Sequence, residues 1–92
     1  MLNAIVLIKA TPAQVSKLGP ALAALDGVSE VYSVTGEWDL VAIVRVRDQE
    51  RLADVVTIEI AGINGIRRTE TMVAFRAYSR HDLDAAFALG SD

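Results

Sequence analysis

No cysteine occurs among the 92 residues, and His81 is the only histidine. Without cysteine, the chain has no disulfide framework, no thiolate zinc site and no cysteine nucleophile, which fits a protein of the cytosol. His81 stands beside Asp82 in a polar stretch, and no serine lies at a spacing typical of a catalytic nucleophile. We therefore expect no catalytic residue and no cofactor.

Basic residues are also few. Nine lysines and arginines are outnumbered by twelve aspartates and glutamates, which gives a net charge of −3. Binding of nucleic acid requires a concentrated basic face, because backbone phosphates must be neutralised. Arg67 and Arg68 come nearest, but neighbouring residues on a strand point to opposite faces, so we expect solvated or paired charges. The carboxylates repeat at no ligand spacing, so no metal site is predicted either.

Long hydrophobic runs are absent. The apolar run at residues 4–8 is too short to span a bilayer and follows no basic leader, so we expect a buried first strand and no membrane attachment. Yet 52% of the residues are hydrophobic and 23% are charged, which is more apolar surface than a single domain this small hides alone. The composition predicts an oligomer.

Strand and helix patterns alternate along the chain and predict the order βαββαβ. The expected strands are 3–10, 28–35, 38–47 and 66–78, the expected helices are 12–25 and 49–61, and residues 83–89 are expected to form one or two terminal helical turns. This order is typical of the ferredoxin-like α+β fold. We expect a four-stranded antiparallel sheet with two helices on one face.

Residues at the helix ends fit this assignment, with one conflict. Thr11 is expected to cap the first helix, Asp48 the second, and Gly27 is expected to close the first. Pro20 cannot donate to Ser16, so we expect the first helix to kink, to split or to begin afresh there.

Both faces of the first strand are apolar. Ala4, Val6 and Ile8 alternate with Ile5 and Leu7, and the third strand shows the same pattern. A sheet that faces water on one side alternates apolar and polar residues instead. We therefore expect a homodimer in which a second subunit's sheet covers the open face.

The segment 35–39, between the second and third strands, predicts a hairpin connection. Gly36 adopts positive φ at little cost and lets a ligand approach the backbone. Asp39 has the chemistry to hold the ammonium group of an amino acid, while backbone N–H groups near Gly36 hold the carboxylate. Alternatively, Asp39 binds the turn's own backbone and Trp38 anchors a subunit interface.

The fourth strand carries a second polar pair. Thr69 and Thr71 share one face, with Glu70 and Met72 on the other. Hydroxyls at this spacing line a polar pocket, although threonine is also favoured in strands for its β-branching.

Two segments, VYSVTGEWDL at residues 31–40 and INGIRRTET at residues 63–71, resemble the C-terminal effector-binding domain of the Lrp/AsnC family. This is the RAM domain, named for regulation of amino acid metabolism, and the resemblance runs from Ile5 to about Phe75. It implies a dimeric α/β barrel or sandwich that assembles further, to a tetramer or an octamer. It also implies that an amino acid or related small metabolite binds between subunits.

The ligand-binding residues implied by this resemblance are Val34, Gly36, Trp38, Asp39, Thr69, Thr71 and Met72. Full-length family members place a helix-turn-helix domain ahead of this region, whereas here the first strand begins at Asn3. The chain therefore resembles a stand-alone effector domain, residues 1–92, that acts alone or with a full-length regulator. Pro20 and Glu70 depart from the family pattern, and Glu70 leaves the identity of the ligand open.

Two other functions share this topology. One is a small dimeric α/β-barrel enzyme of the monooxygenase or isomerase kind, which is expected to have a roomy pocket with a histidine, asparagine or tryptophan pointing into it. The other is a purely structural oligomerisation domain.

Overall fold

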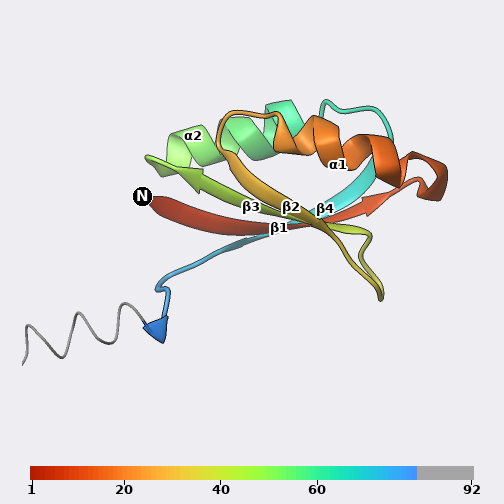
Figure 1. Cartoon of the computed structure of the whole chain (residues 1–92). Helices are drawn as coiled ribbons and strands as arrows, with labels where there is room; N and C mark the ends of the chain where they lie inside the picture. The colour runs from red at the N-terminus through yellow and green to blue at the C-terminus, as the bar shows by residue number, and fades with distance from the viewer. Residues whose placement is uncertain (81–92) are drawn as a thin grey trace, which may run out of the picture.

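Strands and helices alternate along residues 1–80, the part of the chain that the computed structural model describes (Figure 1). The elements are β1 (Leu2–Ala10), the 3-10 helix η1 (Pro12–Gln14), α1 (Val15–Ala23), β2 (Val28–Ser33), β3 (Leu40–Val46), α2 (Gln49–Asp54), the π-helix η2 (Val55–Ile60) and β4 (Ile66–Val73). The terminal helical turns expected at 83–89, like His81, lie outside the described residues.

The strands form one antiparallel sheet in the order β2-β3-β1-β4. Val6, in the middle of β1, lies opposite Ala42 of β3 and Thr71 of β4. Both helices cover the same face of the sheet (Figure 1). The predicted ferredoxin-like α+β fold is confirmed.

The core lies between the helices and this covered face. On β1, Ala4, Val6, Ile8 and Ala10 are at most 2% exposed, and full burial of a branched side chain contributes about 1.5–3 kcal/mol. The other core residues are Leu18, Leu22, Leu40, Ala42, Val44, Val46, Leu52, Val55 and Ile60.

The opposite face of the sheet is apolar, and no helix of residues 1–80 lies on it. We call it the open face; its apolar residues are Ile5, Leu7, Tyr32, Val41, Ile43 and Met72. Tyr32 is 51% exposed and Met72 44% exposed. The predicted presence of two apolar sheet faces is confirmed, and the helices of residues 1–80 cover one of them.

The helix α1 continues through Pro20 without a break, so the predicted split at this position is wrong. Gly19 supplies the reason, because a proline ring clashes with the Cβ of the preceding residue and glycine has none. The helix also ends at Ala23, earlier than expected. The Thr11 side chain makes no capping hydrogen bond. Instead, the backbone carbonyl of Thr11 accepts the Gln14 N–H at 2.8 Å.

The second helical segment begins as predicted and then changes its winding. The Asp48 side chain accepts the Arg51 N–H at 2.8 Å, which confirms the predicted cap. Residues 55–60 form the π-helix η2, in which the Ala61 N–H donates to the Val56 carbonyl at 3.2 Å. The Thr57 hydroxyl donates to the Ala53 carbonyl at 2.6 Å and so competes with the α-helical bond at that carbonyl.

Arg51 ties α2 to the loop after α1. Its guanidinium forms an ion pair with Glu59 and donates to the Asp26 carbonyl at 3.0 Å. The hydrogen bond to Glu59 raises the pKa of Arg51, so the side chain stays charged. The Glu59 carboxylate is thus paired within the same helical segment.

The last strand is shorter than predicted. β4 ends at Val73, and the Ala74 N–H still donates to the Asn3 carbonyl at 2.9 Å. Beyond that bond β1 offers no further partner, since it begins at Leu2. Phe75 and Tyr78 are consequently 99% and 82% exposed.

Gly27→Ala is expected to lower the free energy of unfolding more than Gly36→Ala. The two glycines have φ of +98° and +103°, where an added Cβ costs about 1–2 kcal/mol. At Gly27 that Cβ would also lie 3.2 Å from Val46 and 3.3 Å from Val55, whereas nothing lies within 4 Å of it at Gly36. Urea unfolding measures the difference, and equal losses would contradict close packing at Gly27.

Candidate ligand-binding site

The hairpin between β2 and β3 is held closed and fastened to β1. The Val34 N–H donates to the Asp39 carbonyl at 3.0 Å, and the Asp39 N–H donates to the Ile8 carbonyl at 3.0 Å. Gly36 turns the chain with a φ of +103°, and the space around it is open. The predicted hairpin is confirmed.

Asp39 holds this hairpin against the end of β1. Its Oδ2 accepts the Ala10 N–H at 2.8 Å in a part-buried position. This contact resembles the structural alternative considered for Asp39, except that the donor belongs to β1 and not to the turn itself. The binding of a ligand by Asp39 remains a prediction.

A polar hollow of about 350 Å³ opens beside the hairpin, where the hairpin meets β4. We call it the hairpin pocket; it is lined by Glu37, Trp38, Arg68, Thr69 and Glu70. The Arg68 guanidinium carbon lies 4.8 Å from the centre of the Trp38 ring, and its Nη2 lies 3.2 Å from Glu37 Oε1. The pocket therefore combines a cation, carboxylates and an aromatic face.

The register of the sheet explains why Arg68 reaches the hairpin. Arg68 lies opposite Lys9, and the Lys9 ammonium donates to the Glu37 carbonyl. The sequence predicted a paired or solvated charge at Arg68, and the pair with Glu37 confirms this. The sequence did not predict that Arg68 and Glu37 line the same pocket. Only the register between β1 and β4 brings these two residues together.

The predicted ligand-binding residues lie in several places. Trp38 and Thr69 line the hairpin pocket, and Val34, which is 38% exposed, lies in the hairpin. Thr71 points the same way as Thr69 but lines a separate hollow of about 190 Å³ beneath α2. Met72 lies on the open face. The structure thus brings only part of the predicted set together.

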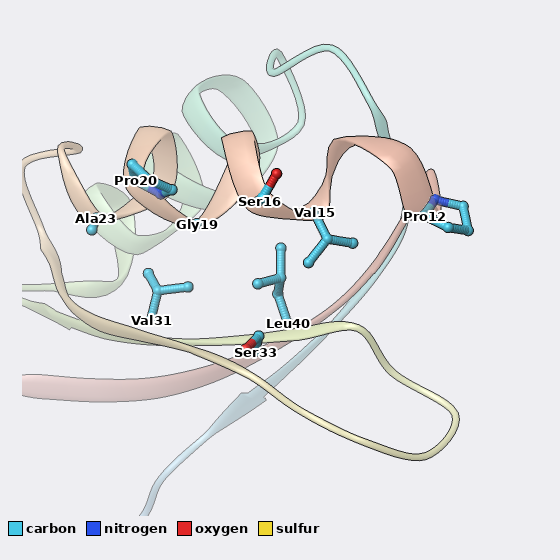
Figure 2. Close-up of a pocket in the computed structure, with 9 residues that line it drawn as sticks. All are labelled: Pro12, Val15, Ser16, Gly19, Pro20, Ala23, Val31, Ser33 and Leu40. Atoms are coloured by element: carbon cyan, nitrogen blue, oxygen red, sulfur yellow. The ribbon is translucent and has the colours of Figure 1, made fainter.

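A second hollow, which the sequence did not reveal, lies between α1 and β2 (Figure 2). Its volume is about 630 Å³, and its lining residues are Pro12, Val15, Ser16, Gly19, Pro20, Ala23, Val31, Ser33 and Leu40. Gly19 and Ala23 leave room on the helix side. None of the lining residues is an acid, a base or a histidine, and the polar side chains among them are those of Ser16 and Ser33.

Residues 1–80 contain neither a cluster of metal ligands nor a membrane-spanning helix. No three histidine or carboxylate side chains there converge on one point as metal ligands would. No helix in the same residues has the length and apolarity needed to cross a bilayer.

The model of the Lrp/AsnC ligand binding domain matches residues 3–83. The chain belongs to the Lrp/AsnC family. In the solved structure of TTHA0845 from Thermus thermophilus, the matched region is 55% identical, with a TM-score of 0.82, and it covers 87% of this chain and 100% of that one.

Other Lrp/AsnC relatives are longer than this chain. An uncharacterized HTH-type transcriptional regulator from Pyrococcus horikoshii, PH1916, is 41% identical over 54 residues, which are 59% of this chain and 36% of the relative. A feast or famine regulatory protein from M. tuberculosis, solved with L-methionine, is 29% identical with a TM-score of 0.73, over 87% of this chain and 54% of that one. The Lrp/AsnC domain thus spans about a third to a half of these regulators.

Arg68→Ala is expected to expose one face of the Trp38 indole, and so to shift its fluorescence to longer wavelength and increase quenching by acrylamide. Trp38 is the only tryptophan, so it is the only source of this signal. Arg67→Ala is the matched control, since Arg67 lies where β4 shifts its register against β1 and does not line the hairpin pocket. An unchanged spectrum for Arg68→Ala would mean that the stacking does not persist in solution.

Asp39→Ala is expected to lower the free energy of unfolding by about 1–3 kcal/mol, because it leaves the Ala10 N–H without an acceptor. Asp39→Asn keeps an oxygen at the same place and is expected to lose less. Chemical denaturation compares the two variants. If the asparagine variant loses as much free energy of unfolding as the alanine variant, the hydrogen bond to Ala10 is not the cause of the destabilisation.

Proposed function

We propose that this Lrp/AsnC domain is a non-enzymatic effector-binding and oligomerisation module whose hairpin pocket binds a free amino acid or a closely related metabolite. The observation that carries the proposal is that Arg68 stacks on the face of Trp38 and also pairs with Glu37. A free amino acid carries a carboxylate, an ammonium group and a side chain on one carbon atom. The pocket offers a cation, a carboxylate and an aromatic ring that complement these three groups.

The roles of the pocket residues follow from their chemistry. Arg68 suits the ligand's carboxylate, since guanidinium groups bind carboxylates with two parallel hydrogen bonds. Glu37 suits the ammonium group, and the open space at Gly36 admits the ligand close to the backbone. Trp38 offers its ring to the ligand's side chain.

The existing pair between Arg68 and Glu37 does not oppose binding. The two side chains are 60% and 71% exposed, and such surface pairs contribute little, typically about 0–1 kcal/mol. A zwitterion that binds both groups replaces one charge pair with two. We therefore expect that breaking the Arg68–Glu37 pair lowers the free energy of ligand binding only slightly.

The relatives support an amino acid as ligand. The M. tuberculosis feast or famine regulatory protein, 29% identical to this chain, is described as complexed with L-methionine. The matched curated relatives are HTH-type transcriptional regulators. We therefore place the domain in the regulation of transcription in the cytoplasm, where the response to ligand reaches DNA through a regulator.

Oligomerisation is part of the proposed function. The open face would expose its apolar centre to water in a monomer, and a second copy of the chain covers it in the assembly we propose. The hairpin pocket lies at the β4 edge of the sheet, where neighbouring subunits meet if such dimers join into a tetramer or an octamer. Ligand binding then biases the assembly by favouring one arrangement.

A screen of the full chain against the twenty amino acids tests the proposal by thermal denaturation. A compound that binds the folded state at 100 times its Kd adds about 2.7 kcal/mol to stability. We expect a rise in melting temperature for at least one amino acid, together with a change in Trp38 fluorescence. Glu37→Gln and Arg68→Gln are expected to abolish the response, while Arg67→Gln, the matched control, retains it.

The outcomes separate the candidate functions. A response that survives both pocket variants would place the ligand elsewhere, with the hollow between α1 and β2 as the next candidate. No response to any amino acid, with unchanged fluorescence, would remove the effector role and leave the purely structural one.

A further inference from the structure

We propose that the hollow between α1 and β2 is a groove for an extended peptide segment of another protein, which adds to β2 as a further strand of the sheet. The inference goes beyond the proposed function, because it depends neither on the hairpin pocket nor on the oligomer. It follows from the hydrogen-bonding phase of β2 and from the residues beside its edge.

The backbone of β2 alternates between its neighbour and the free edge. β2 is an edge strand that pairs with β3. In an antiparallel pair, a residue points both backbone groups at the neighbouring strand, and the next residue points both away. The Val34 N–H donates to the Asp39 carbonyl at 3.0 Å, so Val34 and Tyr32 point toward β3. Val31 and Ser33 therefore point their N–H and C=O groups outward from the sheet.

No other segment of residues 1–80 pairs with this edge. Outside the ladder between β2 and β3, neither Val31 nor Ser33 makes a backbone hydrogen bond in the described part of the chain. Proteins commonly protect edge strands with bulges, prolines or charges. The register shift in β2 lies between Val28 and Glu30, so the two outward-pointing residues lie on the regular part of the strand. This edge can accept another strand.

The side chains of the same two residues line the hollow (Figure 2). Val31 lies opposite Ala42 and Ser33 opposite Leu40, and both partners belong to the core. A strand that adds to β2 extends this covered face of the sheet. Every second side chain of the added strand then points into the hollow.

The helix α1 forms the other wall and leaves room for these side chains. Gly19 and Ala23 line the hollow from α1, and a Cβ added at Gly19 would have nothing within 4 Å. The hollow measures about 630 Å³, against about 350 Å³ for the hairpin pocket. A groove between an edge strand and a helix is a recurring site for peptides that bind by strand addition.

The lining and its surroundings define the chemistry of the peptide. The lining carries no charged side chain, so the inward-pointing residues of the peptide are apolar. On the other side of the strand, the exposed Glu30 precedes Val31. A basic peptide residue opposite Glu30 gains a cross-strand charge pair. The expected ligand has apolar residues opposite Ser33 and Val31, followed by a basic residue.

Binding of a fluorescein-labelled peptide tests the groove by fluorescence anisotropy. The probe is acetyl-Thr-Val-Thr-Val-Lys-Ser-amide, whose two valines are placed opposite Ser33 and Val31 in the antiparallel pairing. We expect saturable binding to the full chain. A matched peptide, methylated on the backbone nitrogens of both valines, keeps the side chains but loses two hydrogen bonds. It is expected to bind at least about 5-fold more weakly.

Two variants of the chain test the two walls of the groove. Ala23→Phe fills the hollow and is expected to lose peptide binding. Ala21→Phe is the matched control, since Ala21 is exposed on the same helix and does not line the hollow. Ser33→Pro removes an outward N–H and is expected to lose binding while the sheet stays folded, because edge strands tolerate proline where the N–H points to solvent. Circular dichroism verifies the fold of each variant.

Four results would each overturn the inference. They are no saturable binding of the unmethylated peptide, equal binding of both peptides, retained binding in Ala23→Phe, and unfolding of Ser33→Pro. The last would mean that the Ser33 N–H is bonded within the sheet.

A fifth result would assign the groove to a different occupant. If sedimentation equilibrium shows that Ala23→Phe lowers the mass of the chain, a second copy occupies the groove, and the peptide assignment is overturned. The response of Trp38 fluorescence to amino acids tests the proposed function separately, and Ala23→Phe is expected to leave that response unchanged.

Discussion

The arrangement of the other elements depends on one constraint, which is that both faces of β1 are apolar. Ala4, Val6 and Ile8 are fully buried on one side, whereas no helix of the described part of the chain lies over Ile5 and Leu7 on the other. Within residues 1–80, two helical segments cover one face of the four-stranded sheet, and the second face carries no helix. The second apolar face is the surface on which we propose that another copy of the chain packs.

The same strand connects that face to the ligand pocket. The end of β1 holds the hairpin through the bonds from Asp39 to the Ile8 carbonyl and from Ala10 to the Asp39 carboxylate. Lys9 adds a contact to the Glu37 carbonyl. In the assembly we propose, a change in how two sheets pack on β1 would reach the hairpin pocket through these bonds, which gives ligand and assembly a physical route for coupling.

The sequence predicted the parts of the molecule that depend on local pattern. The strand alternation, the Asp48 cap and the hairpin glycine were sufficient for the fold and for the hairpin beside which the pocket opens. It did not predict what depends on register or on neighbours: that Arg68 reaches Trp38, that Thr71 lies beneath α2, or that Gly19 accommodates a proline within a helix. Periodicity specifies the face of a strand, but not the residue opposite.

The mass of the full chain in solution tests the central claim most directly. Sedimentation equilibrium at micromolar concentration is expected to give at least twice the mass of one chain, because the open face buries its apolar centre only against a second molecule. A mass equal to one chain over that concentration range would contradict the account, since the apolar side of β1 would then remain in water.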